Sequence, residues 1–189
     1  MRDATESELD AQHSIARTRR TERWTLPEHA LLRRYQLEGA YTDCYITEVA
    51  GEVTHEQYVQ AFYTTLPFRL ERLILKWAVS KPSTDADVAD LASGAATVFA
   101  AWHVEARSED QLLLSDFRGS TRSWLMVEAL ASGAGTRLYF GSAVVPAKTG
   151  GTGRAERGFA YTALLGFHKL YSITLLHAAK RSLERRRRD

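Results

Sequence analysis

The sequence is poor in cysteine and proline, with one cysteine and four prolines among 189 residues. A single cysteine, Cys44, excludes an intramolecular disulfide and a zinc site built from several thiolates, and it fits a reducing compartment. We interpret Cys44 as a small buried apolar residue. A domain of this length buries roughly two-thirds of its unfolded surface, so it needs no covalent staple.

Long uninterrupted apolar runs are also missing. Residues 1–23 mix acids and bases and lack the apolar core of a signal peptide. The most apolar stretch, Phe159–Ala179, contains His168, Lys169 and His177, which favours a core helix over a membrane span. We therefore predict a cytoplasmic protein without a transmembrane segment.

The formal charge is only +2, but it is unevenly distributed. Residues 180–189 contain six basic and two acidic residues. We expect a solvated basic tail over 181–189 with no nucleic acid as partner, although a tail of this kind also suits an anionic surface. Residues 1–23 are expected to form a flexible or frayed arm, which leaves 24–180 as the domain.

Several segments alternate with the period of a β-strand. In Tyr41–Val49, Cys44 and Ile46 fall on one face, and Asp43 and Tyr45 fall on the other. Apolar residues also alternate from Val98 through Trp102 to Ala106, which predicts one further strand. Three more strands are predicted after short turns, at Gln111–Phe117, Thr121–Leu130 and Thr136–Val145. Such links are typical of an antiparallel meander.

Helix signals flank these strands. Thr54 with Gln57 is a capping box that predicts a helix through Leu66, and Ser83 or Thr84 is placed to cap a helix over Asp85–Ala92 that ends at Gly94. Periodic apolar residues predict two more helices, over Phe68–Ala78 and over Phe159–Arg186. The apolar stripe of the last one is expected to be Leu164, Phe167, Tyr171, Leu175 and Ala178. This order of elements indicates an α+β fold.

No motif assigns a reaction. The glycines of Lys148–Gly158 fit neither a dinucleotide-binding nor a P-loop spacing, so we interpret this segment as a surface loop. His168 and His177 would lie on opposite sides of their helix and therefore would not bind one metal ion. We predict no metal site and no cofactor. A nucleophile elbow is also missing, and no catalytic residue is assigned.

A few polar residues leave alternatives open. His103 and Glu105 share a strand face, which suits proton transfer and equally suits a solvent-facing surface. The carboxylates Glu71, Asp116 and Glu128 lie in apolar segments, either as buried acids or paired with arginines such as Arg72 and Arg122. The aromatic side chains over the sheet and helices are consistent with a solid core and with a ligand cavity.

Four segments resemble a known family. They are Trp102–Ala106 (WHVEA), Arg122–Glu128 (RSWLMVE), Gly135–Leu138 (GTRL) and Leu164–Tyr171 (LLGFHKLY). They resemble the W-x-V-E-A, R-x-W-L, G-x-R-L and L-x-x-F-H-x-L pattern of the DUF2867-like family, which belongs with the START-like (SRPBCC, helix-grip) superfamily. The resemblance covers about residues 97–180, and the N-terminal part departs from it.

The resemblance implies a curved antiparallel sheet wrapped on a long C-terminal helix. Members of the superfamily hold lipids, sterols, polyketides or aromatic hormones between these parts, and a minority are enzymes. We therefore expect a carrier or sensor of a small apolar ligand, and the protein could form a homodimer. The expected cavity is lined by Trp102, Trp124, Phe140, His168 and Tyr171. The alternatives are a cyclase- or hydrolase-like enzyme that uses Glu71, His103 or His168 as acid or base, and a ligand-free adaptor whose basic tail contacts membrane or nucleic acid.

Overall fold

The computed structural model describes residues 21–65, 84–145 and 172–188. Its fold is α+β, as predicted, with one seven-stranded antiparallel sheet in the order β1-β2-β7-β6-β5-β4-β3. The helices are α2 (Arg33–Leu37), α3 (His55–Tyr63), α5 (Asp85–Ser93) and a helix over residues 172–186, here called the C-terminal helix. The strands are β1 (Glu22–Arg23), β2 (Tyr41–Ala50), β3 (Val98–Phe99), β4 (Trp102–Arg107), β5 (Gln111–Asp116), β6 (Thr121–Ala129) and β7 (Gly135–Val144).

The predicted meander is confirmed, because β4, β5, β6 and β7 pair consecutively and antiparallel. The first predicted strand is β2, which pairs with β7 along its whole length, from Tyr41 opposite Val144 to Ala50 opposite Gly135. The segment that holds α3 and α5 connects β2 to β3 at the far edge of the sheet. These helices therefore cross one face of the sheet.

One strand prediction was wrong. The chain turns at Ala100 and Ala101, so that β3 and β4 form a hairpin where the alternation indicated a single strand. Ala100 has φ 52°, a left-handed conformation, and an alanine there carries no sequence signal for a turn. A bulge between Val104 and Ala106 also changes the alternation of β4. Val98 is consequently 63 % exposed, and Ala106 packs on the opposite side of the sheet from Val104.

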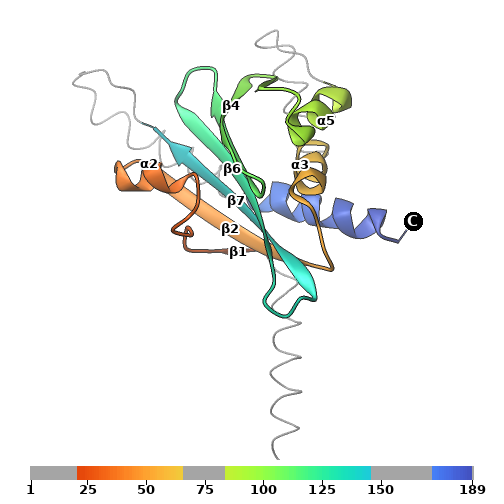
Figure 1. The fold of residues 1–189 in the computed structure, drawn as a ribbon. Helices are drawn as coiled ribbons and strands as arrows, with labels where there is room; N and C mark the ends of the chain where they lie inside the picture. The colour runs from red at the N-terminus through yellow and green to blue at the C-terminus, as the bar shows by residue number, and fades with distance from the viewer. Residues whose placement is uncertain (1–20, 66–83, 146–171, 189) are drawn as a thin grey trace, which may run out of the picture.

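Figure 1 shows α3, α5 and the C-terminal helix on one side of the sheet and α2 on the other, and an apolar cluster of side chains lies on each of these two faces. We call the face covered by α3, α5 and the C-terminal helix the helix face, and the other one the α2 face. The predicted division of β2 is confirmed, since Tyr45 lies on the helix face and Cys44 and Ile46 lie on the α2 face. In β6, where both faces are apolar, Leu125 faces the helices and Trp124 faces α2.

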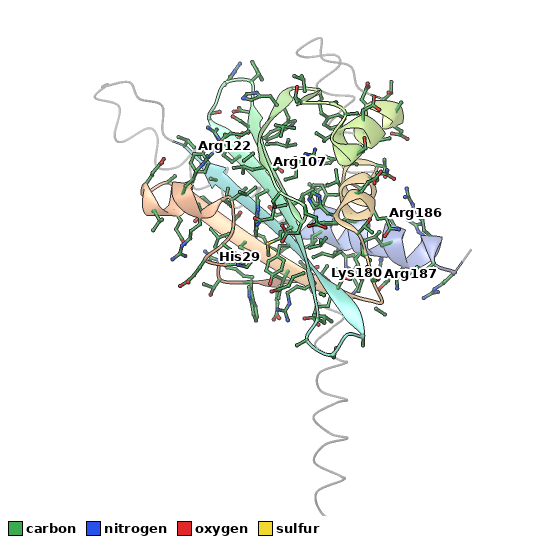
Figure 2. The ribbon with its side chains drawn as sticks, in the orientation of Figure 1. His29, Arg107, Arg122, Lys180, Arg186 and Arg187 are labelled. Carbon is green, nitrogen blue, oxygen red and sulfur yellow. The ribbon has the colours of Figure 1, made fainter. Side chains whose placement is uncertain are left out.

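The capping box predicted for α3 is confirmed, and of the two candidate caps of α5 the structure selects Thr84, which forms a capping box with Asp87. The Thr54 hydroxyl accepts from the Gln57 N–H at 3.2 Å at the start of α3, and the Thr84 hydroxyl accepts from the Asp87 N–H at 3.2 Å at the start of α5. Gly94 ends α5 with φ 88°. Arg107 of β4 donates to the last carbonyls of the same helix, which holds α5 against the sheet (Figure 2).

The C-terminal helix contacts β2 and β7, an arrangement consistent with a helix-grip fold. Its buried apolar residues are Leu175, Leu176, Ala179 and Leu183, whereas Ala178 of the expected stripe is only half-buried. The predicted helix over 68–78, the glycine-rich loop over 148–158 and residues 159–171 of the long helix lie outside the described residues.

Residues just outside both predicted domain boundaries take part in the fold. Glu22 and Arg23, which belong to the expected N-terminal arm, pair with Ile46 and Tyr45 of β2. Leu183, in the expected tail, is buried in the cluster on the helix face. Within the described ranges, none of the helices has the length and apolarity that crossing a membrane requires.

Candidate functional site

The structure separates the side chains that the sequence grouped as a ligand site. Phe140 of β7 is buried in the cluster on the helix face, and Trp102 of β4 is half-buried against the same cluster, next to the edge strand β3. Trp124 is fully buried on the α2 face, on the opposite side of the sheet from Phe140. His168 and Tyr171 lie outside the described residues. The helix face therefore holds two of the three expected residues whose positions are described.

Aromatic rings form the centre of the helix face. Phe62 of α3 packs on Phe140 of β7, with ring centroids 5.0 Å apart, and on the neighbouring Tyr63 at 5.2 Å. Tyr63 in turn lies 5.4 Å from Phe99 of β3. Tyr45 of β2 is buried in the same cluster. These rings supply a large apolar surface in the layer between the sheet and its helices.

A row of polar groups crosses this apolar face. Asp43 of β2, Ser142 of β7 and Ser123 of β6 are direct cross-strand neighbours. Asp43 Oδ1 accepts from the backbone N–H of Ser142 at 3.1 Å and also from its hydroxyl. The Ser123 hydroxyl lies 3.3 Å from the phenolic oxygen of Tyr63. The row thus begins at β2, crosses β7 and β6, and ends at Tyr63 of α3.

The second carboxylate oxygen of Asp43 is the unusual atom of the row. Asp43 is only 4 % exposed, and its Oδ2 is buried with no hydrogen-bond partner among the described residues. Thr47, on the same face of β2, also has a buried hydroxyl that lacks a partner in the described part of the chain. Burying a polar atom without a partner costs about 1–3 kcal/mol, and more when the atom is charged. These positions are where a bound donor would gain most.

The neighbours of Asp43 are held in their neutral forms. Burial, and next the charge of Asp43, raise the pKa of the Tyr45 phenol and of the Cys44 thiol to about 12 each. Neither group is ionised near neutral pH, so Cys44 offers no thiolate nucleophile. The interpretation of Cys44 as a buried apolar residue is confirmed.

Trp124 takes part in a buried network on the α2 face. Its indole N–H donates to Gln111 Oε1 at 2.9 Å, and the same oxygen accepts from the Leu31 N–H at 2.9 Å. The Gln111 amide nitrogen donates to the carbonyl of His29 at 3.2 Å. Gln111 therefore ties the segment that precedes α2 to the sheet and satisfies the polar atom of Trp124.

The polar pairs considered from the sequence have other partners. Glu105 forms an ion pair with Arg122 and accepts from the Tyr35 hydroxyl at 2.5 Å, whereas His103 is exposed. Asp116 accepts from the backbone N–H groups of Ser120 and Thr121 and shapes the β5–β6 turn. Glu105 and Asp116 therefore have structural roles, the first in an ion pair and the second in a turn.

Glu128 accepts from the hydroxyl of Tyr139 at 2.5 Å and lies 3.6 Å from the guanidinium of Arg137. Its expected pairing with an arginine is therefore found, although the partner is Arg137. Glu71, the remaining carboxylate, lies outside the described residues.

The sequence reasoning missed the polar row, although one signal was present. Asp43 stands in a strand on the same face as Tyr41 and Tyr45, where an acidic residue in an apolar pattern indicates a special environment. Ser142 and Ser123 carry no such signal, because only the strand register brings them beside Asp43. Within the described ranges, no three His, Cys, Asp or Glu side chains are arranged to hold a metal ion.

No protein-family model matches the chain, and no curated protein sequence or solved structure matches it significantly.

Proposed function

We propose that the helix face binds a small, largely apolar molecule and that the protein acts as a carrier or sensor of it. The observation that carries the proposal is the buried Oδ2 of Asp43, which lacks a partner in the described part of the chain. The aromatic rings of Phe62, Tyr63 and Phe140 lie on the same face. An apolar surface with a few fixed polar groups is the usual composition of a small-molecule site.

The two parts of the site would contribute differently to binding. Apolar contact stabilises a complex by about 25 cal/mol per Å² of area removed from water, without fixing orientation. Asp43, held by Ser142, would orient the ligand because a carboxylate oxygen accepts hydrogen bonds only. The expected ligand therefore carries a hydroxyl or N–H donor on an otherwise apolar frame.

The likeness to the DUF2867-like family and to the START-like superfamily supports this proposal. The sheet and C-terminal helix are compatible with the helix-grip architecture, whose members hold apolar ligands between these two parts. Membership of that family is part of the proposal, and so is a site between the sheet and the C-terminal helix.

Native mass spectrometry of the purified full chain, beside a denatured control, tests the proposal directly. We expect a specific apolar small molecule to co-purify, or the emptied protein to take up N-phenyl-1-naphthylamine, a neutral aromatic probe with one N–H donor, with a rise in its fluorescence. Asp43→Asn keeps an oxygen for Ser142 and removes the charge, so it should weaken probe binding about tenfold.

Cys44→Ala is the matched control, because Cys44 is the next residue of β2 and is equally buried on the α2 face. It should bind the probe as the unmodified chain does. A protein that contains no small molecule and takes up neither the probe nor a panel of lipids would show that the helix face is a solid core. Equal losses in both variants would show that the Asp43 effect reflects stability alone.

A further inference from the structure

A polar groove lies at one end of the sheet, apart from the site proposed above. It has a volume of about 540 Å³ and is formed where the β2–α3 connection, the β4–β5 turn and the ends of β6 and β7 meet the segment that precedes α2. The lining residues that carry charge or an imidazole are His29, Glu52, His55, Glu109, Asp110 and Glu128. The volume suits a ligand of small organic size.

His55, the first residue of α3, lines this groove and is only 7 % exposed. Its Nε2 is buried without a hydrogen-bond partner among the described residues. Burial, and next the charge of Arg107, lower the pKa of His55 to about 4. The imidazole is therefore neutral near pH 7, and in the tautomer with its proton on Nδ1 the ring presents a lone pair at Nε2 that accepts a hydrogen bond.

The rest of the groove is acidic. Four carboxylates contribute to it, and its lining contains neither lysine nor arginine. Glu128 is partly compensated by Arg137, and Asp110 accepts from the Ser108 hydroxyl at 2.7 Å. Carboxylates gathered around a concave surface create a negative potential that attracts cations. The groove thus combines negative charge with one buried acceptor that lacks a donor.

We propose that this groove binds an organic cation with N–H donors, of the alkyl-ammonium class. One ammonium N–H would donate to Nε2 of His55, and the carboxylates of Glu52 and Glu109 would hold the positive charge. A metal ion fits less well, because in the described part of the chain no three His, Cys, Asp or Glu side chains are arranged to hold one. An anion is disfavoured by the four carboxylates. This inference does not depend on the ligand of the helix face.

Calorimetric titration of the full chain with 1,4-diaminobutane tests the inference, beside its fully N-methylated counterpart, which keeps both charges but has no N–H. The amine should bind, and the methylated compound should bind about tenfold more weakly or not at all, because it offers no donor to His55. This comparison requires no substitution. Equal affinity for the two compounds, or no binding of either, would overturn the proposal.

The double variant Glu52→Gln and Glu109→Gln tests the electrostatic part. Both side chains lie at the surface, so the variant should fold, while amine binding should weaken about tenfold and depend less on salt. Glu56→Gln is the matched control, since Glu56 is exposed on α3 and does not line the groove. Retained affinity in the double variant, or an equal loss in the control, would place amine binding outside the groove.

Discussion

At the scale of single residues, the buried amide of Gln111 organises the α2 face. It satisfies the indole N–H of Trp124, the backbone N–H of Leu31 and the carbonyl of His29 at once. Two of these groups belong to the segment before α2 and the third to β6, so one side chain connects the N-terminal segment to the centre of the sheet. Buried polar groups of this kind are costly when one partner is removed.

Gln111→Leu should therefore destabilise the protein by about 2 kcal/mol, because it keeps the side-chain size but leaves buried donors without an acceptor. Urea denaturation followed by tryptophan fluorescence measures the change. Glu109→Gln, two residues away and exposed, should stay within about 0.5 kcal/mol of the unmodified chain. A Gln111→Leu variant as stable as this control would contradict the role given to the amide.

His55 makes stability depend on pH. Its folded pKa of about 4 lies below the ordinary value of 6.5, so the unfolded chain binds more protons than the folded one between these values. Stability should fall as pH decreases from 6.5 to 4, by up to about 3 kcal/mol from this residue. Because carboxylates also titrate there, the measurement is the difference between the unmodified chain and His55→Leu. Parallel pH profiles for the two would disprove the prediction.

At the scale of elements, capping residues decide where the helices on the helix face begin. The sequence identified the cap of α3 because a capping box is a local pattern of side chains and backbone N–H groups, whereas for α5 it left Ser83 or Thr84, and the structure selects Thr84. The α3 cap also positions two candidate sites, since α3 carries Phe62 and Tyr63 in its last turn and His55 in its first.

Thr54→Ala should lower the free energy of unfolding by about 1 kcal/mol, since it removes the acceptor of the Gln57 N–H. Thr54→Ser keeps a hydroxyl at the same place and should recover most of the loss. Chemical denaturation of the three proteins provides the comparison. If alanine and serine behave alike, the hydroxyl does not cap α3.

At the scale of the whole molecule, the C-terminal basic region belongs partly to the fold. Lys180 is 6 % exposed, and its Nζ donates to the Glu48 carbonyl of β2 at 2.7 Å. Arg187 donates to the carbonyl of Ala50, the last residue of β2, and to that of Glu52 just after it. Leu183, which lies between Lys180 and Arg187 in the sequence, is buried. Figure 2 labels Lys180 on the C-terminal helix and Arg187, which directly follows the helix. Deleting residues 180–189 would therefore remove part of the core together with the charge.

Replacing Arg185, Arg186 and Arg188 by glutamine separates charge from folding. All three are exposed, so the triple variant should keep its stability within about 0.5 kcal/mol, whereas the deletion should cost several kcal/mol. Thermal unfolding measures both. Co-sedimentation with anionic vesicles then tests the adaptor alternative, which requires that the unmodified chain associates and that the triple variant does not.

The sequence by itself determined the strands from β5 to β7, the strand β2 and the start of α3 and α5. Each of these depends on alternation or on contacts between near neighbours, which a linear pattern records. It did not distinguish the β3–β4 hairpin from one strand, because Ala100 and Ala101 give no turn signal and the bulge in β4 changes the side-chain faces without changing composition.

Only the tertiary structure decided which face of β6 meets the helices and which polar side chains lie together. Trp124 and Leu125 are equally apolar neighbours, so their sequence cannot assign either one to the helix face. The row from Asp43 to Ser123 arises from the register of three strands, although Ser142 lies 99 residues after Asp43 along the chain and Ser123 belongs to another strand, β6. The hydrophobic pattern of a strand shows that one of its faces is buried. Strand pairing and packing decide which elements cover that face.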